Sequence, residues 1–192
     1  MMNVMADAAR EISIISASEY LAREQTSQTR HEFVNGVVYA MVGASERHNL
    51  IALNLASALS SHLGLPETCS VFHADMKLSI ALDRAEYFYY PDIMVCCGPS
   101  NQSLHFREDP ILLGEVLSPT TERTDRAEKF DAYRKIPALE EYILIAQDAP
   151  RVEIFRRRTD WRRETFLVED TFRLECVDFA TTVKALYRRV KF

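Results

Sequence analysis

Residues 111–117 read ILLGEVL, an apolar run interrupted by a single carboxylate. A run of this length and composition predicts a buried β-strand. Because side chains alternate between the two faces of a strand, Glu115 shares a face with Leu113 and Leu117. A buried carboxylate without partners is costly, so Glu115 must find a cation or hydrogen-bond donors, or take up a proton. The other open interpretation puts Glu115 at the edge of the sheet, bonded to water and backbone.

A second acid interrupts an apolar run upstream. Residues 89–97 read YYPDIMVCC, with Asp92 directly after Pro91 near the start of an expected strand. An Asp in this position is commonly a turn residue. A shared metal would explain both lone acids, because Mg²⁺ is typically held by one or two carboxylates together with waters and substrate phosphate.

The helix expected over about 122–135 adds a cation. Lys129 falls inside the apolar stripe of this helix, which consists of Phe130, Ala132, Tyr133 and Ile136. Asp125 lies one turn earlier, at the i,i+4 spacing of an ion pair. Two interpretations are open: Lys129 snorkels to solvent while paired with Asp125, or it points at the two acids, where it orients a water and offsets phosphoryl charge.

The rest of the chain alternates short helices and strands. Ser16 begins a capping box for a helix to about Gln25, Asn35-Gly36 marks a hairpin, and Ser45 caps a long helix that ends near Gly64. Further strands are expected over 70–72 continuing through 76–80, over 90–97 and 142–146, and in a late hairpin of 152–155 and 161–167. These patterns predict one mixed α/β (α+β) domain over 1–192, with a mixed sheet flanked by two long helices and a flexible extension over 1–15.

Composition narrows the class of protein. The 192 residues are long enough to bury a core without staples. The absence of a long apolar run and of a signal-like N-terminus predicts a cytoplasmic protein with no membrane partner. The four cysteines form no CxxC pair, so we expect them to be reduced and mostly buried, without a structural zinc. The sequence holds no Gly-x-Ser-x-Gly motif and no Gly-rich phosphate loop, which disfavours a serine hydrolase and nucleotide-dependent chemistry.

The charge of the chain is unevenly distributed. A net charge of −5 argues against a protein that coats nucleic acid generically, but the residues from 151 onward carry 11 Lys and Arg against 7 Asp and Glu. This segment includes Arg156-Arg157-Arg158. Charged hairpin edges that resist sheet-to-sheet aggregation are one interpretation, and a phosphate-contacting patch is the other.

An ordered set of residues resembles the PD-(D/E)XK nuclease superfamily and, more narrowly, the Uma-type restriction endonuclease family. The resemblance extends from about Tyr20 to Tyr187. Its motifs are Glu32 with Asn35-Gly36, His48, Pro91-Asp92, Glu115 to Thr121, Asp125, Lys129, Tyr133, Glu141-Tyr142 and Trp161. One position departs from the superfamily, because its Glu-x-Lys motif would put a lysine where this chain has Leu117. The resemblance implies that Lys129 on the following helix replaces it.

The resemblance implies a restriction-endonuclease-like fold and a metal-dependent DNA endonuclease. Asp92 and Glu115 would ligate Mg²⁺ or Mn²⁺, with the Val116 carbonyl as a further ligand, and Lys129 would position or help deprotonate the attacking water. Glu32 would be an additional acid, although a surface position on the hairpin is equally open. Asp75 and His48 are expected to be structural hydrogen-bond partners.

Cleavage of both strands of a duplex favours a homodimer. Two other functions stay open. A catalytically degenerate DNA-binding or regulatory module is favoured by Leu117, and an interaction protein would keep its acids for structural reasons alone.

Overall fold

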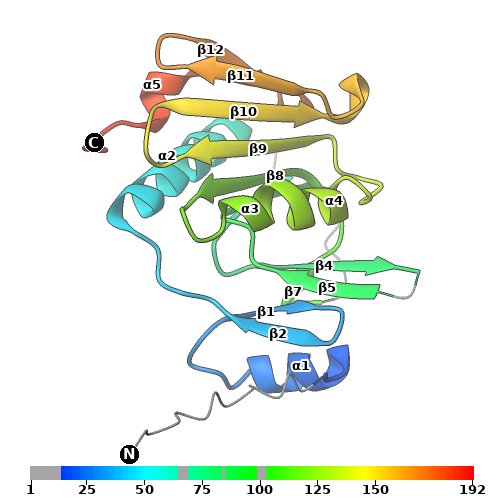
Figure 1. The fold of residues 1–192 in the computed structure, drawn as a ribbon. Helices are drawn as coiled ribbons and strands as arrows, with labels where there is room; N and C mark the ends of the chain where they lie inside the picture. Colours follow the sequence, from blue (N-terminus) through cyan, green and yellow to red (C-terminus); the bar gives the residue numbers. More distant parts are fainter. Residues whose placement is uncertain (1–13, 65–68, 84, 99–102) are drawn as a thin grey trace, which may run out of the picture.

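The structure, a computed structural model, describes residues 14–64, 69–83, 85–98 and 103–192. Most of the predicted extension over 1–15 therefore lies outside the described residues. Two sheets form the framework (Figure 1). The larger one runs, from edge to edge, through β11 (Arg163–Leu167), β10 (Arg151–Arg156), β9 (Glu141–Ala146), β8 (Pro110–Leu117), β6 (Ile93–Cys97) and β3 (Cys69–His73).

Helices cover both faces of this six-stranded sheet, as predicted. β8 and β9 pair in parallel and the other neighbours are antiparallel, so the sheet is mixed. Leu112 and Val116 pack in the core beneath α2 (Glu46–Leu63), whereas Leu113 and Leu117 pack in the core on the opposite face. Strand alternation therefore turns Glu115 away from α2.

The second covering helix contains a wide turn. The expected continuous helix consists of α3 (Glu122–Thr124), a π-helical turn over Asp125–Lys129 and α4 (Phe130–Tyr133). In Figure 1 this segment lies in front of β8, and α2 lies behind the sheet. A π-turn holds one more residue than an α-turn, and such turns frequently occur at functional sites.

The smaller sheet was not predicted as a separate sheet. Helix α1 (Ala17–Glu24) packs on it through Tyr20, which lies against Phe33 and Phe88. Asn35 and Gly36 both have positive φ, which confirms the predicted hairpin turn. In spatial order, its strands are β2 (Val37–Ala40), β1 (His31–Val34), β5 (Ala85–Tyr89), β4 (Lys77–Leu82) and β7 (Phe106–Arg107).

Two of the points at which the chain crosses between the two sheets are adjacent in space. The continuous strand expected through 70–80 is wrong, because β3 and β4 belong to different sheets and Ala74 between them has φ +59°. The strand expected from residue 90 begins at Ile93, after Pro91-Asp92 has separated β5 from β6. The Ala74 amide donates to the Asp92 carbonyl at 3.2 Å, so the two crossings brace each other.

The C-terminal part begins with the predicted late hairpin, in which β10 pairs with β11. The remaining elements are the turns Arg157–Thr159 and Glu175–Val177, the strands β12 (Thr171–Leu174) and β13 (Phe179–Thr182), and α5 (Val183–Leu186). Within the described ranges, no helix has the length and apolar character needed to cross a membrane. The cytoplasmic location stays a prediction.

The expectation that all four cysteines are reduced is wrong. Cys69 and Cys97 stand directly opposite each other on β3 and β6 and form a disulfide. Their pairing depends on the register of two strands whose cysteines are 28 residues apart in the sequence. Cys96, which points to the other face of β6, is buried and free, and Cys176 is free and half-buried.

Candidate active site

Asp92 and Glu115 meet at one end of the β6–β8 pair, as the sequence predicts. Asp92 lies at the crossing just before β6, and Glu115 lies within β8, where Ile93 pairs with Gly114. The Asp92 amide donates to Glu115 Oε2 at 3.4 Å, and the Val116 amide donates to Asp92 Oδ2 at 2.7 Å. The backbone of β8 thus fixes the orientation of the Asp92 carboxylate.

Lys129 points inward from the π-turn and does not snorkel. Lys129 is only 6% exposed to solvent. Its Nζ lies 3.0 Å from Glu32, 3.2 Å from Glu115 and 3.4 Å from Asp125. One ammonium thus joins carboxylates from both sheets and from its own helix.

Glu32 reaches the site from β1 of the smaller sheet. Its Oε1 accepts a hydrogen bond from the Tyr90 amide at 3.3 Å and lies beside Lys129. Glu32 is therefore not a surface residue of the hairpin, which was the alternative expectation, because its side chain is only 15% exposed.

Three further side chains, which were not among the predicted catalytic or metal-binding residues, also contribute contacts, and the predicted i,i+4 pair of Asp125 with Lys129 is confirmed. Tyr133 donates from its hydroxyl to Glu115 Oε1 at 2.9 Å, and both side chains are buried. Asp125 is also buried. Among the described residues, its Oδ1 is a buried side-chain oxygen that accepts no hydrogen bond. His48 places Nε2 3.0 Å from Asp92 Oδ2. Helical spacing suggested the inward direction of Tyr133, but nothing in the sequence indicated the contact across 44 residues between His48 and Asp92.

The first turn of α2 holds His48 in place. Ser45 is the N-cap of this helix, and its Oγ accepts a hydrogen bond from the His48 amide at 3.1 Å. Asp75, the other residue expected to be structural, has a mostly exposed side chain and pairs with Arg30 at 3.4 Å.

The site contains an excess of negative charge. Burial, followed by the charges of Asp125, Asp92 and Glu32, raises the pKa of Glu115 well above its usual value, although Lys129 acts in the opposite direction. Burial also raises the pKa of Asp125. For Lys129, burial alone would lower the pKa, but the surrounding carboxylates outweigh it and the pKa is raised. The ammonium therefore carries its proton at neutral pH.

The donor set suits a hard divalent cation. Three carboxylates surround Lys129 and Asp92 lines the same pocket, and oxygen ligands are those that Mg²⁺ and Mn²⁺ prefer. Among the described residues, no three His, Cys, Asp or Glu side chains converge as a complete metal cage. The arrangement thus fits an ion held by one or two carboxylates and completed by waters, which is the usual way in which Mg²⁺ is bound.

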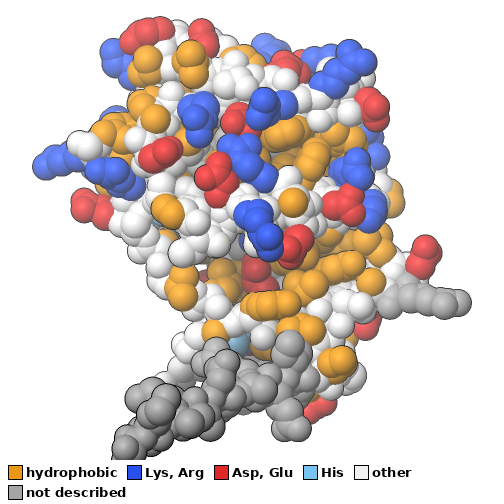
Figure 2. All heavy atoms as spheres, viewed as in Figure 1, with side chains coloured by type: hydrophobic (Ala, Val, Ile, Leu, Met, Phe, Trp, Pro, Cys, Tyr) orange, Lys and Arg blue, Asp and Glu red, His pale blue; other side chains and the backbone are white. Residues whose placement is uncertain are grey.

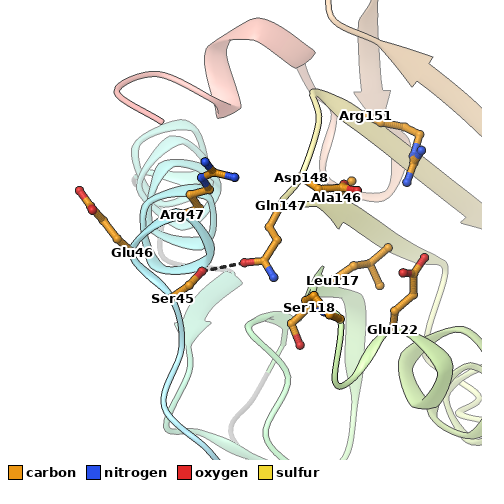
Figure 3. A pocket seen from close by; sticks show the side chains of 11 residues that line it. Ser45, Glu46, Arg47, Leu117, Ser118, Glu122, Ala146, Gln147, Asp148 and Arg151 are labelled. Atoms are coloured by element: carbon orange, nitrogen blue, oxygen red, sulfur yellow. Dashed lines mark hydrogen bonds between the residues drawn. The ribbon is translucent and has the colours of Figure 1, made fainter. Parts of the chain in front are cut away.

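The site opens to solvent through a pocket of about 640 Å³. Asp92, Glu115, Asp125, Lys129 and His48 all line it. A second pocket of about 550 Å³ adjoins it (Figure 3), and the two share Ser45, Ser118, Pro119 and Gln147. A substrate larger than the first pocket can therefore extend into the second.

The arginine run of the late hairpin binds to its own chain. Arg156 is buried against Glu141, with Nε and Oε1 2.6 Å apart. Arg157 donates to the carbonyls of Leu139 and Ile136, and Arg158 pairs with Glu175. Figure 2 shows basic and acidic side chains intermixed on this face, over β9–β11 and α3, rather than one basic patch. The run therefore stabilises the hairpin.

Known proteins resemble this chain over most of its length. The uncharacterized protein slr1290 of Synechocystis sp. (strain PCC 6803) is 30% identical over 181 residues, 93% of this chain and 94% of that protein. The uncharacterized protein sll1609 of the same organism is 36% identical over 159 residues, 81% and 87% of the two chains.

A solved structure has the same fold. It is the crystal structure of a putative nuclease belonging to DUF820 from Anabaena variabilis, with a TM-score of 0.76 at 16% sequence identity, and the match covers 92% of this chain and 99% of that one. The family model Uma2, described as "Putative restriction endonuclease", matches residues 17–184. The family model confirms the family that the sequence motifs suggested, and the solved structure confirms the fold. The chain thus belongs to the Uma2 family.

Proposed function

We propose that this protein is a metal-dependent endonuclease that hydrolyses phosphodiester bonds in DNA. One observation carries the proposal: Asp92 and Glu115 meet at the base of an open pocket, with the ammonium of Lys129 3.2 Å from Glu115. Paired carboxylates can hold the ion for metal-assisted hydrolysis of a phosphodiester, and an adjacent lysine can stabilise the charge on the phosphoryl group. Membership of a family described as restriction endonucleases supports the same reaction class.

Each group has a distinct role in this proposal. Asp92 and Glu115 would hold Mg²⁺ or Mn²⁺, with the Val116 carbonyl as a further ligand. The bound ion would neutralise charge on the scissile phosphate and lower the pKa of a bound water. Lys129 is charged, so it would donate hydrogen bonds to that water and to the phosphoryl oxygens rather than accept a proton. Glu32 and Asp125 would keep Lys129 in position.

Cleavage of both strands with one site per chain favours a two-fold pair of sites, so we propose a homodimer as the active form. A degenerate DNA-binding module of the same fold is the second candidate. The observation that favours it is Leu117, whose side chain packs in the core where a superfamily lysine would stand. Metal-dependent turnover separates the two candidates.

The test is the nicking of supercoiled plasmid with Mg²⁺ or Mn²⁺. Asp92→Asn and Glu115→Gln keep the size of each side chain, and Lys129→Met keeps much of the length of the lysine. Asp75→Asn, at the rim of the same pocket, is the matched control. We expect wild type and the control to nick DNA, EDTA to stop the reaction, and the three site variants to lose it by about 100-fold or more.

Circular dichroism of each variant must show an intact fold before its activity is compared. Nicking that survives both acid variants would overturn the proposed metal site. DNA binding without nicking in either metal would instead support the degenerate module.

A further inference from the structure

The pocket beyond the candidate active site continues the same groove. Ser45 and Gln147 lie at the junction of the two pockets, where Ser45 Oγ donates to Gln147 Oε1 at 2.7 Å. Figure 3 shows this bond and, beside it, the Gln147 amide nitrogen turned to the side of Ser118. A polymer that places one phosphodiester at Asp92 and Glu115 must direct its neighbouring phosphates out of the first pocket, and the adjoining one receives them.

Two arginines line this second pocket from separate elements. Arg47 comes from the first turn of α2, and Arg151 begins β10. In Figure 3 they lie on opposite sides of the pocket, while Glu46 points away from it. The Arg47 guanidinium lies over the Phe192 ring, with its Cζ 5.6 Å from the ring centroid, and this contact with its face leaves its N–H edge to a ligand.

Two of the acids near this pocket are paired with a third arginine, Arg126. Glu122 lies 2.7 Å from Arg126 Nε, and Glu153 is bound by both terminal nitrogens of Arg126. Arg151 Nε is 3.7 Å from Glu153, too far for a hydrogen bond. Of the two other acids of the lining, Glu46 points away from the pocket in Figure 3 and Asp148 is exposed to solvent.

The backbone that carries Arg151 is fixed. The Tyr187 hydroxyl donates to the Ala146 carbonyl at 2.6 Å and accepts a hydrogen bond from the Arg151 amide at 3.1 Å. This contact ties α5 to the turn between β9 and β10. Because Ser45 caps α2 next to Arg47, both arginines start from rigid positions, which lowers the entropic cost of binding a ligand.

We infer that this pocket binds the phosphodiester backbone beside the cleaved bond, with Arg47 and Arg151 contacting its phosphates. The planar guanidinium matches phosphate oxygens with paired hydrogen bonds. The inference rests on the proposed function, in which a nucleic-acid strand occupies the adjoining carboxylate site. It assigns the path of that strand: from Asp92 and Glu115, past Ser45 and Gln147, to the two arginines.

The experiment measures DNA binding without catalysis. Fluorescence anisotropy follows a labelled duplex of about 20 base pairs in EDTA, with KCl varied from about 50 to 200 mM. The variants are Arg47→Ala, Arg151→Ala and the double variant. The control is Arg163→Ala, an exposed arginine at the opposite end of the β10–β11 hairpin from Arg151.

We expect each single variant to bind about fivefold to tenfold more weakly, and the slope of log K against log salt to fall by about 1 per lost phosphate contact. Arg163→Ala should keep the wild-type slope, and Arg47→Lys should recover most of the slope because it restores the charge. Plasmid nicking should show a raised KM with an unchanged kcat.

Four results would overturn the inference: wild-type protein that does not bind the duplex, unchanged slopes in both alanine variants, an equal loss in Arg163→Ala, or a loss of kcat with KM unchanged. The nuclease proposal fails separately. If no metal supports nicking but Arg47→Ala and Arg151→Ala reduce the slope, the phosphate site stands and the catalytic role does not. If nicking depends on Asp92 and Glu115 while the slopes stay constant, only the inference fails.

Discussion

His48 Nε2 lies 3.0 Å from Asp92 Oδ2, the same oxygen that accepts a hydrogen bond from the Val116 amide. The first turn of α2 and the backbone of β8 therefore hold one carboxylate from two directions. Partners that orient a metal-binding carboxylate typically change metal affinity by about 10-fold to 100-fold when they are removed.

We therefore expect His48→Ala to weaken Mn²⁺ binding by about 10-fold to 100-fold, because Asp92 loses one of its two restraints. Electron paramagnetic resonance of free Mn²⁺ measures this directly, without DNA. His105→Ala, an exposed histidine, should bind as wild type does. Wild-type affinity in a folded His48→Ala protein would show that this contact does not position the site.

Glu115→Gln should stabilise the metal-free protein at neutral pH. The raised pKa of Glu115 means that the folded state binds its proton more tightly than the unfolded state does, so burial of the ionised carboxylate opposes folding. The amide keeps the acceptor for Tyr133 and removes the charge. We expect the melting temperature in EDTA to rise by about 2–4 °C, the shift for about 1 kcal/mol in a chain of this size.

The same argument fixes the pH dependence. A folded-state pKa above the unfolded value makes wild-type stability fall as pH rises through the range between the two values. The advantage of Glu115→Gln should therefore shrink in acid, where the wild-type carboxyl is protonated in both states. A constant difference across pH 4–8, or a less stable variant at pH 7, would contradict the charge argument.

Lys129→Met should destabilise the metal-free protein strongly. It leaves Glu32, Glu115 and Asp125 without the cation that joins them, and removal of one partner from a buried ion pair costs about 3–5 kcal/mol. Urea unfolding in EDTA measures the loss. Mn²⁺ should restore more stability to this variant than it adds to wild type, because the ion supplies the missing positive charge. Equal effects of Mn²⁺ on both proteins would contradict this.

The Cys69–Cys97 disulfide should contribute to stability. It closes a loop between cysteines 28 residues apart, for which the chain-entropy relation gives about 3–4 kcal/mol. Thiol titration of the denatured, non-reduced protein should detect only Cys96 and Cys176. Dithiothreitol should lower the melting temperature of wild type but not that of Cys97→Ala. A titre of all four thiols would show that the bond does not form.

The sequence predicted those parts of the site that depend on local periodicity. Alternation along β8 gave the direction of Glu115, and helical spacing turned Lys129 inward, even though the π-turn adds a residue that a 3.6 period does not anticipate. The motifs of the family indicated Glu32 as an additional acid, and its side chain lies beside Lys129.

The parts that were missed depend on contacts between distant segments. The division of the strands between two sheets depends on a positive φ at Ala74, a residue that rarely adopts it. The contact of His48 with Asp92 and the pairing of Cys69 with Cys97 follow from how helices and strands assemble. Neither leaves a pattern within one segment.

The position of Lys129 has a thermodynamic consequence. Its ammonium connects Glu32 of the five-stranded sheet to Glu115 of the six-stranded sheet, so separation of the sheets breaks one of the two ion pairs. A cation that binds Glu115 changes the charge around Lys129, and so does a contact that moves β1 with Glu32. By reciprocity, each event must therefore shift the equilibrium of the other. Binding of a cation at Glu115 and the local opening of the N-terminal sheet would thus be coupled equilibria.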